Sequence, residues 1–151
     1  MVTLTSQHVR FIERMRVAHP ATIDEAGQPH VLPVCYAAVR GVIYTPVDEK
    51  PKRVAASLLG RVRNILTDPR VSLVWDHYEE DWTRLAWLQV RGTAELVEAA
   101  AERAAALAAL RDRYPQYSAM DLEPRPLIRI TPTHVRSWTA SVRRSRGSRP
   151  P

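Results

Sequence analysis

The spacing of apolar residues changes several times along the chain, and each change predicts a new element. Residues 6–17 begin with Ser6, a good N-cap residue, and then place apolar side chains three residues apart, which is typical of a short helix. Alternating, β-branched stretches follow at residues 21–24, 30–39 and 42–45. The turns between them are too short to hold a crossover helix, so we predict antiparallel strands rather than βαβ units.

The second half of the chain predicts two longer helices and longer strands. Residues 51–66 carry one apolar stripe, have a proline in the first turn and stop at an Asp-Pro pair, while residues 98–114 form an alanine-rich helix that ends before a proline. Further strands are predicted at residues 71–75, 85–97 and 126–138. We expect Gly92 to mark a bulge or bend, and Pro132 to break the last strand.

This order of elements predicts the fold class. About six strands with three helices, two of which interrupt the strand order, indicate an α+β protein whose antiparallel sheet closes into a small barrel. A chain of 151 residues is long enough for one domain with its own core. We assign residues 1–142 to that domain and residues 143–151, RRSRGSRPP, to a disordered basic tail.

Charge and composition narrow the function less than they first suggest. Without the four arginines of the tail, the formal net charge falls from +6 to +2, so the basic composition is weak evidence for nucleic-acid binding. No apolar run reaches membrane-spanning length, and the N-terminus is charged where a secretion signal would be apolar. Cys35 is the only cysteine, which agrees with a reducing compartment. We expect a cytoplasmic protein.

Both lysines of the chain, Lys50 and Lys52, lie between a short apolar strand and the start of a predicted helix. Cations and free backbone N–H groups converge at such a junction, which favours binding of a phosphate. Arg61 and Arg63 follow in the helix but cannot face the same way, and we favour Arg61 as a bidentate phosphate ligand. A solvated charged turn is the structural alternative for the two lysines.

Residues 76–82, DHYEEDW, combine possible metal ligands with aromatic side chains. The acids lack the fixed spacing of a calcium loop, so we predict no metal site and interpret the segment as a loop that lines a cleft. Tyr78 and Trp82 could stack on a ligand ring there. Cys35 lies on an apolar strand and is interpreted as buried and inert. His30 and His134 have no triad partners at a recognisable spacing.

Several segments, in this order, resemble a known family. They are GQPHVLPV, IYTPVDEKPK, RVRNILTDPRVSLVWD, HYEEDW and WLQVRGTAEL. From about residue 9 to Trp138 the chain resembles the split β-barrels related to pyridoxamine-phosphate oxidase, and among them the actinobacterial branch that uses the deazaflavin F420. The resemblance implies an antiparallel Greek-key split barrel with flanking helices. It also implies a homodimer with cofactor sites at the interface.

The resemblance further implies a role for each matching position. The strand along the flavin-type ring would comprise His30, Leu32, Pro33, Val34 and Cys35. The residues near the ribityl chain and phosphate would be Tyr44 and Thr45. The cations near the phosphate and the acidic tail of F420 would be Lys50, Lys52 and Arg61, the last replacing a lysine of the flavin-dependent members. The tryptophans lining the cleft, from either subunit, would be Trp75, Trp82 and Trp87.

The resemblance implies an F420-dependent oxidoreductase that passes a hydride between F420 and a small unsaturated substrate. Its partners would be that small molecule and a second copy of itself, not a membrane or a nucleic acid. We name no acid–base residue, because the cofactor carries the chemistry. An FMN-dependent oxidoreductase of the same fold is one alternative. Another is a non-enzymatic flavin or haem carrier, with His30, His77 or His134 as axial ligand. The chain lacks the Trp/Arg-rich C-terminal segment that recognises pyridoxamine phosphate, which argues against vitamin B6 oxidation.

Overall fold

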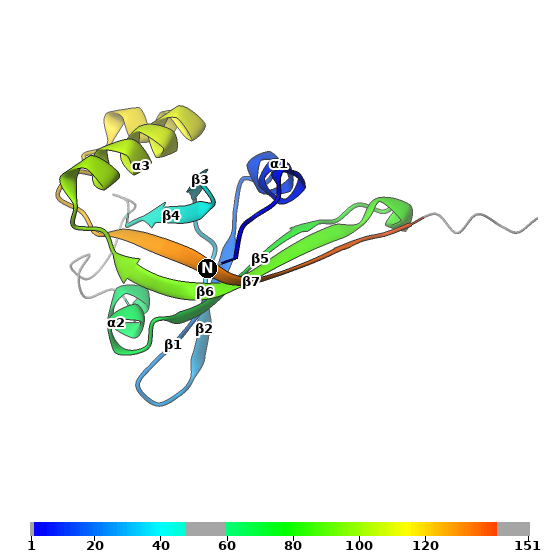
Figure 1. The fold of residues 1–151 in the computed structure, drawn as a ribbon, viewed down its shortest axis with the longest axis horizontal. Helices are drawn as coiled ribbons and strands as arrows, with labels where there is room; N and C mark the ends of the chain where they lie inside the picture. The colour runs from blue at the N-terminus through cyan, green and yellow to red at the C-terminus, as the bar shows by residue number, and fades with distance from the viewer. Residues whose placement is uncertain (1, 48–59, 142–151) are drawn as a thin grey trace, which may run out of the picture.

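The computed structural model describes residues 2–47 and 60–141, which form one antiparallel sheet of seven strands with helices on both sides (Figure 1). The elements in chain order are α1 (Ser6–Arg14), β1 (His19–Ile23), β2 (Pro29–Val31), β3 (Ala37–Val39), β4 (Val42–Pro46), α2 (Gly60–Thr67), β5 (Arg70–His77), η2 (Trp82–Arg84), β6 (Ala86–Leu96), α3 (Ala100–Arg113), η3 (Pro115–Ala119) and β7 (Leu127–Thr139). The predicted α+β class is confirmed. The predicted helix over residues 51–66 lies largely outside the described residues, as does the predicted tail.

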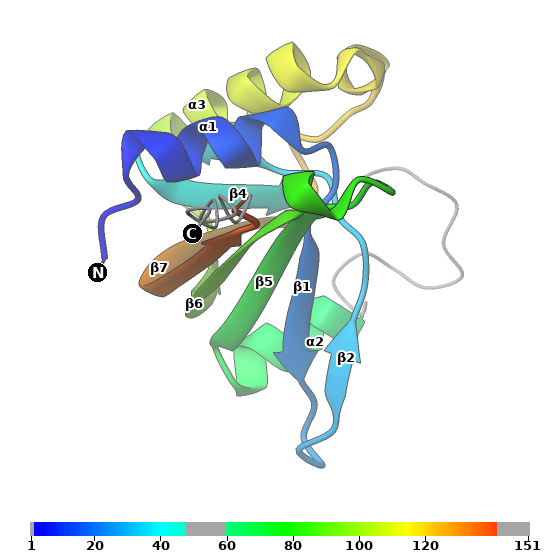
Figure 2. The same cartoon turned by 90° about the vertical axis from the view of Figure 1, so that its right-hand side faces the viewer.

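The strand order β2-β1-β5-β6-β7-β4-β3 leaves β2 and β3 as the two edges. No described pairing joins these edges, so the sheet is open and the predicted closure into a barrel is not found. The segment that links β2 to β3 nevertheless crosses from one edge to the other, and Ala18 and Val34 exchange backbone hydrogen bonds of 3.0 and 2.8 Å on the way. Figure 2 shows the strands fanning out from one another, so the sheet is strongly twisted.

The strand predicted over residues 30–39 is in fact two short strands, β2 and β3. Pro33 lies between them, and a proline cannot donate to a strand ladder, which explains the interruption. The predicted turn at residues 40 and 41 is confirmed. Arg40 and Gly41 both have positive φ, 51° and 79°, the conformation that a tight two-residue hairpin requires.

The long pair β6–β7 contains the bulge expected at Gly92. The pairing shifts from Arg91 opposite His134 to Gly92 opposite Pro132, so Thr133 is the extra residue. Its hydroxyl donates to the backbone carbonyl of Arg91 at 3.1 Å. The predicted break of β7 at Pro132 is wrong: the strand continues because the bulge accommodates the missing N–H.

Two apolar cores flank the sheet. The first lies between the sheet, α1 and α2, and includes Ile12, Ile65 and Trp75. The second packs α3 onto the β3–β4 side of the sheet through Leu107 and Leu110. None of the helices in the described ranges is long and apolar enough to cross a membrane.

The N-terminal helix α1 is fixed at both ends. Its N-cap is Thr5 rather than the predicted Ser6: the Thr5 hydroxyl accepts the His8 backbone N–H, and His8 Nδ1 accepts the Thr5 N–H, both at 3.2 Å. At the other end Arg113, the last residue of α3, donates to the Glu13 carbonyl at 2.9 Å and lies 4.7 Å from the Tyr36 ring centroid. These contacts hold the C-terminal end of α1 against the end of α3, next to Tyr36.

Candidate functional site

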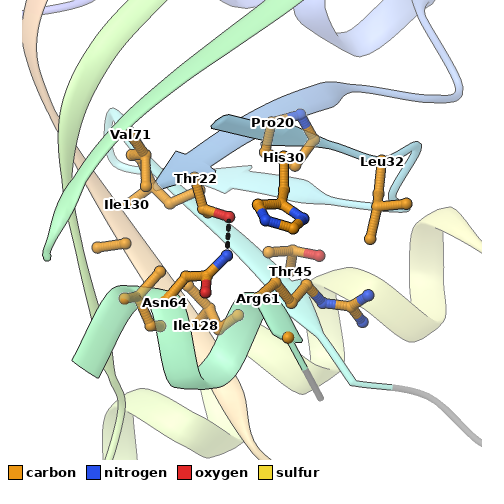
Figure 3. A pocket seen from close by; sticks show the side chains of 13 residues that line it. Pro20, Thr22, His30, Leu32, Thr45, Arg61, Asn64, Val71, Ile128 and Ile130 are labelled. Carbon is orange, nitrogen blue, oxygen red and sulfur yellow. Dashed lines mark hydrogen bonds between the residues drawn. The ribbon is translucent and has the colours of Figure 1, made fainter. Parts of the chain in front are cut away.

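A cavity of about 110 Å³ lies between the β1–β2 hairpin, β4 and the first turns of α2 (Figure 3). Its apolar wall includes Pro20, Leu32, Ile65, Val71, Ala94, Ile128 and Ile130. Its polar side chains come from four elements: Thr22, His30, Thr45, Arg61 and Asn64. The lining is largely apolar and none of its described residues is acidic, so its few polar groups are hydroxyl, amide, imidazole and guanidinium. An apolar cavity with a few converging polar groups, one of them a guanidinium, can hold an anionic group.

Thr45 provides the most informative group in the cavity. Successive side chains of a strand point to opposite faces, so Thr45 faces the cavity while Tyr44 faces the second core. The Thr45 hydroxyl is buried and has no hydrogen-bond partner among the described residues. A buried polar group without a partner costs roughly 1–3 kcal/mol, so such groups often mark a ligand or water position.

The helix α2 is pinned to β1 beside the cavity. Asn64 Nδ2 donates to the Thr22 hydroxyl at 2.9 Å, and both residues are buried. Figure 3 shows this bond on one side of the cavity and the guanidinium of Arg61 on the other. Arg61 is half-buried and Arg63 is exposed, as their separation on one helix requires. The helix therefore presents one arginine to the cavity and the other to solvent.

His30 stands at the rim of the cavity and is held by the β1–β2 turn. The Asp24 carboxylate accepts the backbone N–H groups of Ala26 and Gln28, each at 2.9 Å, and closes the predicted turn. Its second oxygen lies 2.9 Å from His30 Nε2. This hydrogen bond is the main cause that lowers the pKa of Asp24 below its ordinary value. The contact orients the imidazole beside the cavity.

Four of the predicted cofactor residues meet in this cavity: His30, Leu32, Thr45 and Arg61. The other described residues of the two predicted strands lie elsewhere. Pro33 is exposed, Val34 belongs to the first core, and Cys35 and Tyr44 pack in or against the second. The alternation of side chains along a strand explains why whole segments do not face one site. Lys50 and Lys52 lie outside the described residues.

The three tryptophans expected to line one cleft are in three different places. Trp75 is fully buried in the first core, where it packs edge-on against Tyr36 with ring centroids 5.5 Å apart. Trp82 is 67% exposed in η2. Trp87 is half-buried and lines a second cavity at the far end of β6. Trp75 therefore differs most from the expectation, because a side chain closed off by core packing cannot wall a cleft.

Two polar residues of the cavity, Thr22 and Asn64, had no assigned role in binding from the sequence. The bond from Asn64 to Thr22 gives both residues a packing role between α2 and β1. The sequence carries a sign of this contact, since Asn64 falls between Val62 and Ile65 in the buried face of α2. A polar side chain on an apolar stripe needs a partner, and here the partner comes from β1.

The loop after β5 forms a small ion-pair cluster. Glu79 pairs with His77 Nε2 at 2.7 Å and with Arg84 Nε at 3.1 Å. Across residues 2–47 and 60–141, no group of three or more His, Cys, Asp or Glu side chains could hold a metal ion.

Tyr44 has a separate polar environment under α3. Its hydroxyl donates to Glu102 Oε1 at 2.8 Å, and Arg129 Nη1 donates to the same oxygen at 2.7 Å. Burial, followed by the hydrogen bond to Glu102, raises the pKa of Tyr44 to about 12. The side chain thus stabilises the docking of α3 onto β4 and is turned away from the cavity.

Replacing Tyr44 with phenylalanine should lower the free energy of unfolding by about 1 kcal/mol at pH 8, the usual size of a lost hydrogen bond. Because the native pKa of Tyr44 is raised, the contribution of its hydroxyl is complete below pH 10 and is lost as the pH rises through about 12. The difference between wild type and variant should therefore shrink over that range in urea unfolding. The Tyr78→Phe variant, at an exposed position, is the control. A difference that stays constant up to pH 12 would contradict the assignment.

Comparison with known protein families identifies the family of this chain. Residues 4–139 match the family described as pyridoxamine 5'-phosphate oxidase. The chain belongs to the pyridoxamine 5'-phosphate oxidase family. The match covers all the described elements, including every residue that lines the cavity. A comparison with curated proteins finds no match.

Solved structures show the same fold for this member of the pyridoxamine 5'-phosphate oxidase family. A conserved hypothetical protein, Rv2991 from Mycobacterium tuberculosis, is 24% identical with a TM-score of 0.74, covering 93% of this chain and 87% of the other. A haem-binding protein from Mycobacterium smegmatis is 23% identical with a TM-score of 0.71, covering 95% and 57%. An FAD-binding protein from Mesorhizobium loti is 21% identical with a TM-score of 0.64, covering 90% and 95%.

Proposed function

We propose that this protein is an F420-dependent oxidoreductase whose first cavity holds the phosphate of the cofactor. A hydride would pass between the deazaflavin and a small unsaturated substrate. The observation that carries the proposal is the buried Thr45 hydroxyl, which has no hydrogen-bond partner in the described part of the chain. It shares its cavity with Arg61 and with no described acid.

The residues present fit the anionic part of such a cofactor. A cavity of about 110 Å³ is below the roughly 300–1,000 Å³ of complete ligand sites, so it accommodates a phosphate-sized group rather than the whole molecule. The ring would lie outside, along the exposed apolar side chains of Val31 and Leu32. We further propose that a second copy of the chain covers the ring, with a dimer in sedimentation as the expected result.

The chain's own residues would bind and orient rather than react. Arg61 would neutralise the phosphate and the hydroxyl of Thr45 would donate to it, while the Asn64–Thr22 bond holds α2 in place. The apolar wall would keep water away from these contacts and so strengthen them. When bound, F420 supplies the carbon that accepts or gives the hydride.

The test is a titration of purified protein with F420, followed by the change in cofactor fluorescence. Thr45→Val and Arg61→Gln should each weaken F420 binding by about tenfold to a hundredfold, since a charge-assisted contact contributes about 1.5–3 kcal/mol. Arg63→Gln is the matched control, because it removes the same charge from the exposed face of the same helix. Equal losses in the two arginine variants would mean that charge, not this cavity, determines affinity. No measurable F420 binding would end the proposal.

FMN is the second candidate cofactor, favoured by the family and by the likeness to an FAD-binding protein. FMN also carries a phosphate, so the same cavity residues would bind it. A yellow protein with an oxidised-flavin spectrum after purification would favour FMN over F420. Competition between the two cofactors at equal concentration measures the preference.

A haem carrier is the candidate from a different class, because one structural neighbour is a haem-binding protein. Among the three candidate axial ligands, His30 is the one that stands beside the cavity. A Soret band on haem titration that disappears in His30→Ala would favour the carrier. In that case F420 and FMN should bind no better to wild type than to the Arg61→Gln variant.

A further inference from the structure

A second, larger cavity lies at the other end of the β5–β7 ribbon. It measures about 530 Å³ and is lined by α1 and by the adjoining ends of the three strands. It shares no lining residue with the first cavity. Along β6 the two are separated by six residue steps, from Leu88 to Ala94, or about 20 Å of extended chain. A group bound in the first cavity would not fill the second.

The second cavity has a broad apolar wall with one aromatic ring facing it. Its apolar side chains are Phe11, Met15, Ala86 and Leu88. Phe11 comes from α1, which stands over the ribbon in Figure 1, and Met15 is the C-cap of that helix, while Ala86 and Leu88 come from β6. Trp87 borders the cavity, but the alternation of side chains along β6 places its ring on the face opposite to Leu88. The aromatic face of Phe11 suits a flat ring. The volume falls in the range of small-molecule sites.

The cavity also carries two arginines. Arg14, in the last turn of α1, has its guanidinium carbon 5.7 Å from the centroid of the Phe11 ring and makes no ion pair within residues 2–47 and 60–141. Arg84 pairs with Glu79 through Nε, and its side chain is 70% exposed. Glu79 also holds His77 at 2.7 Å and does not itself line the cavity. Arg14 is therefore the less compensated cation.

Hydrogen bonding adds further donors to the same lining. His8 Nδ1 accepts the Thr5 backbone N–H in the cap of α1, so the neutral ring carries its proton on Nε2 and can donate from there. The hydroxyls of Ser137 and Thr139 also border the cavity. Donors next to an aromatic wall select a molecule with both an acidic group and a ring.

We propose that this second cavity binds an anionic aromatic molecule, with its acid group between Arg14 and Arg84 and its ring against Phe11 and Leu88. The site is distinct from the proposed cofactor site, and its occupation does not depend on the cofactor. It would give the protein a second small-molecule ligand, of the class of aryl carboxylates, sulfonates or phosphates.

A matched pair of dyes tests the two halves of this proposal. Anilinonaphthalene sulfonate supplies the ring and the anion, and neutral phenylnaphthylamine supplies the ring alone. The sulfonate dye should bind one to one with micromolar affinity, and the Arg14→Gln/Arg84→Gln double variant should bind it at least tenfold more weakly. Binding of the neutral dye should change less than twofold.

Arg136→Gln is the control, because Arg136 is exposed on β7 beside Ser137 and does not line the cavity. It should leave the affinity for the sulfonate dye unchanged. The Phe11→Ala variant should bind both dyes more weakly than wild type, whereas Trp82→Phe should not, with folding of all variants checked by circular dichroism. Equal affinity in the double variant and wild type would overturn the proposal, as would displacement of the dye by saturating F420.

Discussion

Replacing Trp75 with alanine is expected to lower the free energy of unfolding by about 3–5 kcal/mol. The side chain is fully buried and is among the largest in the first core. It packs edge-on against Tyr36, and its strand pairs with β6 through Leu88. Truncation to alanine would leave a cavity in the first core that the surrounding side chains cannot fill. Urea unfolding followed by far-UV circular dichroism measures the loss.

The Trp82→Ala variant is the matched control, because Trp82 is 67% exposed. Its free energy of unfolding should change by no more than about 0.5 kcal/mol. Comparing the two variants distinguishes a tryptophan in the core from one on the surface, and the comparison needs no ligand. Equal effects of the two substitutions would contradict the placement of Trp75 in the core.

Replacing Gly92 with alanine should lower the free energy of unfolding by about 3 kcal/mol, at the upper end for an added methyl group. A Cβ atom at this position would lie 2.2 Å from the Thr131 carbonyl oxygen and 3.0 Å from its carbon. Both atoms belong to the backbone of β7, which cannot move without disturbing the longest strand pair of the sheet. Thermal unfolding of the variant measures the effect.

Gly60→Ala provides the same chemical change at a position where a Cβ meets no atom of residues 2–47 and 60–141 within 4 Å. Because alanine is the better helix former, this variant should be as stable as wild type or more stable, by up to about 1 kcal/mol. If Gly92→Ala were also neutral, the bulge opposite Pro132 would have to be looser than the structure shows.

The sequence predicted well those features that depend on local chemistry. The helix at residues 98–114, the turn at Arg40-Gly41 and the bulge at Gly92 each follow from the conformational limits of single residues. Pro132 was misread because its tolerance depends on the register with Gly92 across the sheet. Register between distant strands is a property of the pairing, which no single segment specifies.

The same limit applies to the candidate site. A resemblance assigns roles to segments, whereas a strand divides its side chains between two faces, so Thr45 enters the cavity while Tyr44 enters the second core. Trp75 could not be separated from Trp82 by residue type, because only packing decides which is enclosed. The Asn64–Thr22 bond joins positions 42 residues apart and becomes visible only when α2 packs on β1.

The contact between Arg113 and the end of α1 has a consequence for how the chain reaches its native state. The hydrogen bond from Arg113 to Glu13 spans 100 residues, so the N-terminal helix cannot complete its docking until α3 has been synthesised. Contacts between residues this far apart in the sequence slow folding, because the chain loses the entropy of closing a long loop before it gains the contact. On the ribosome, the first helix would have its contacts with Tyr36 but not those with Arg113 while the later strands emerge.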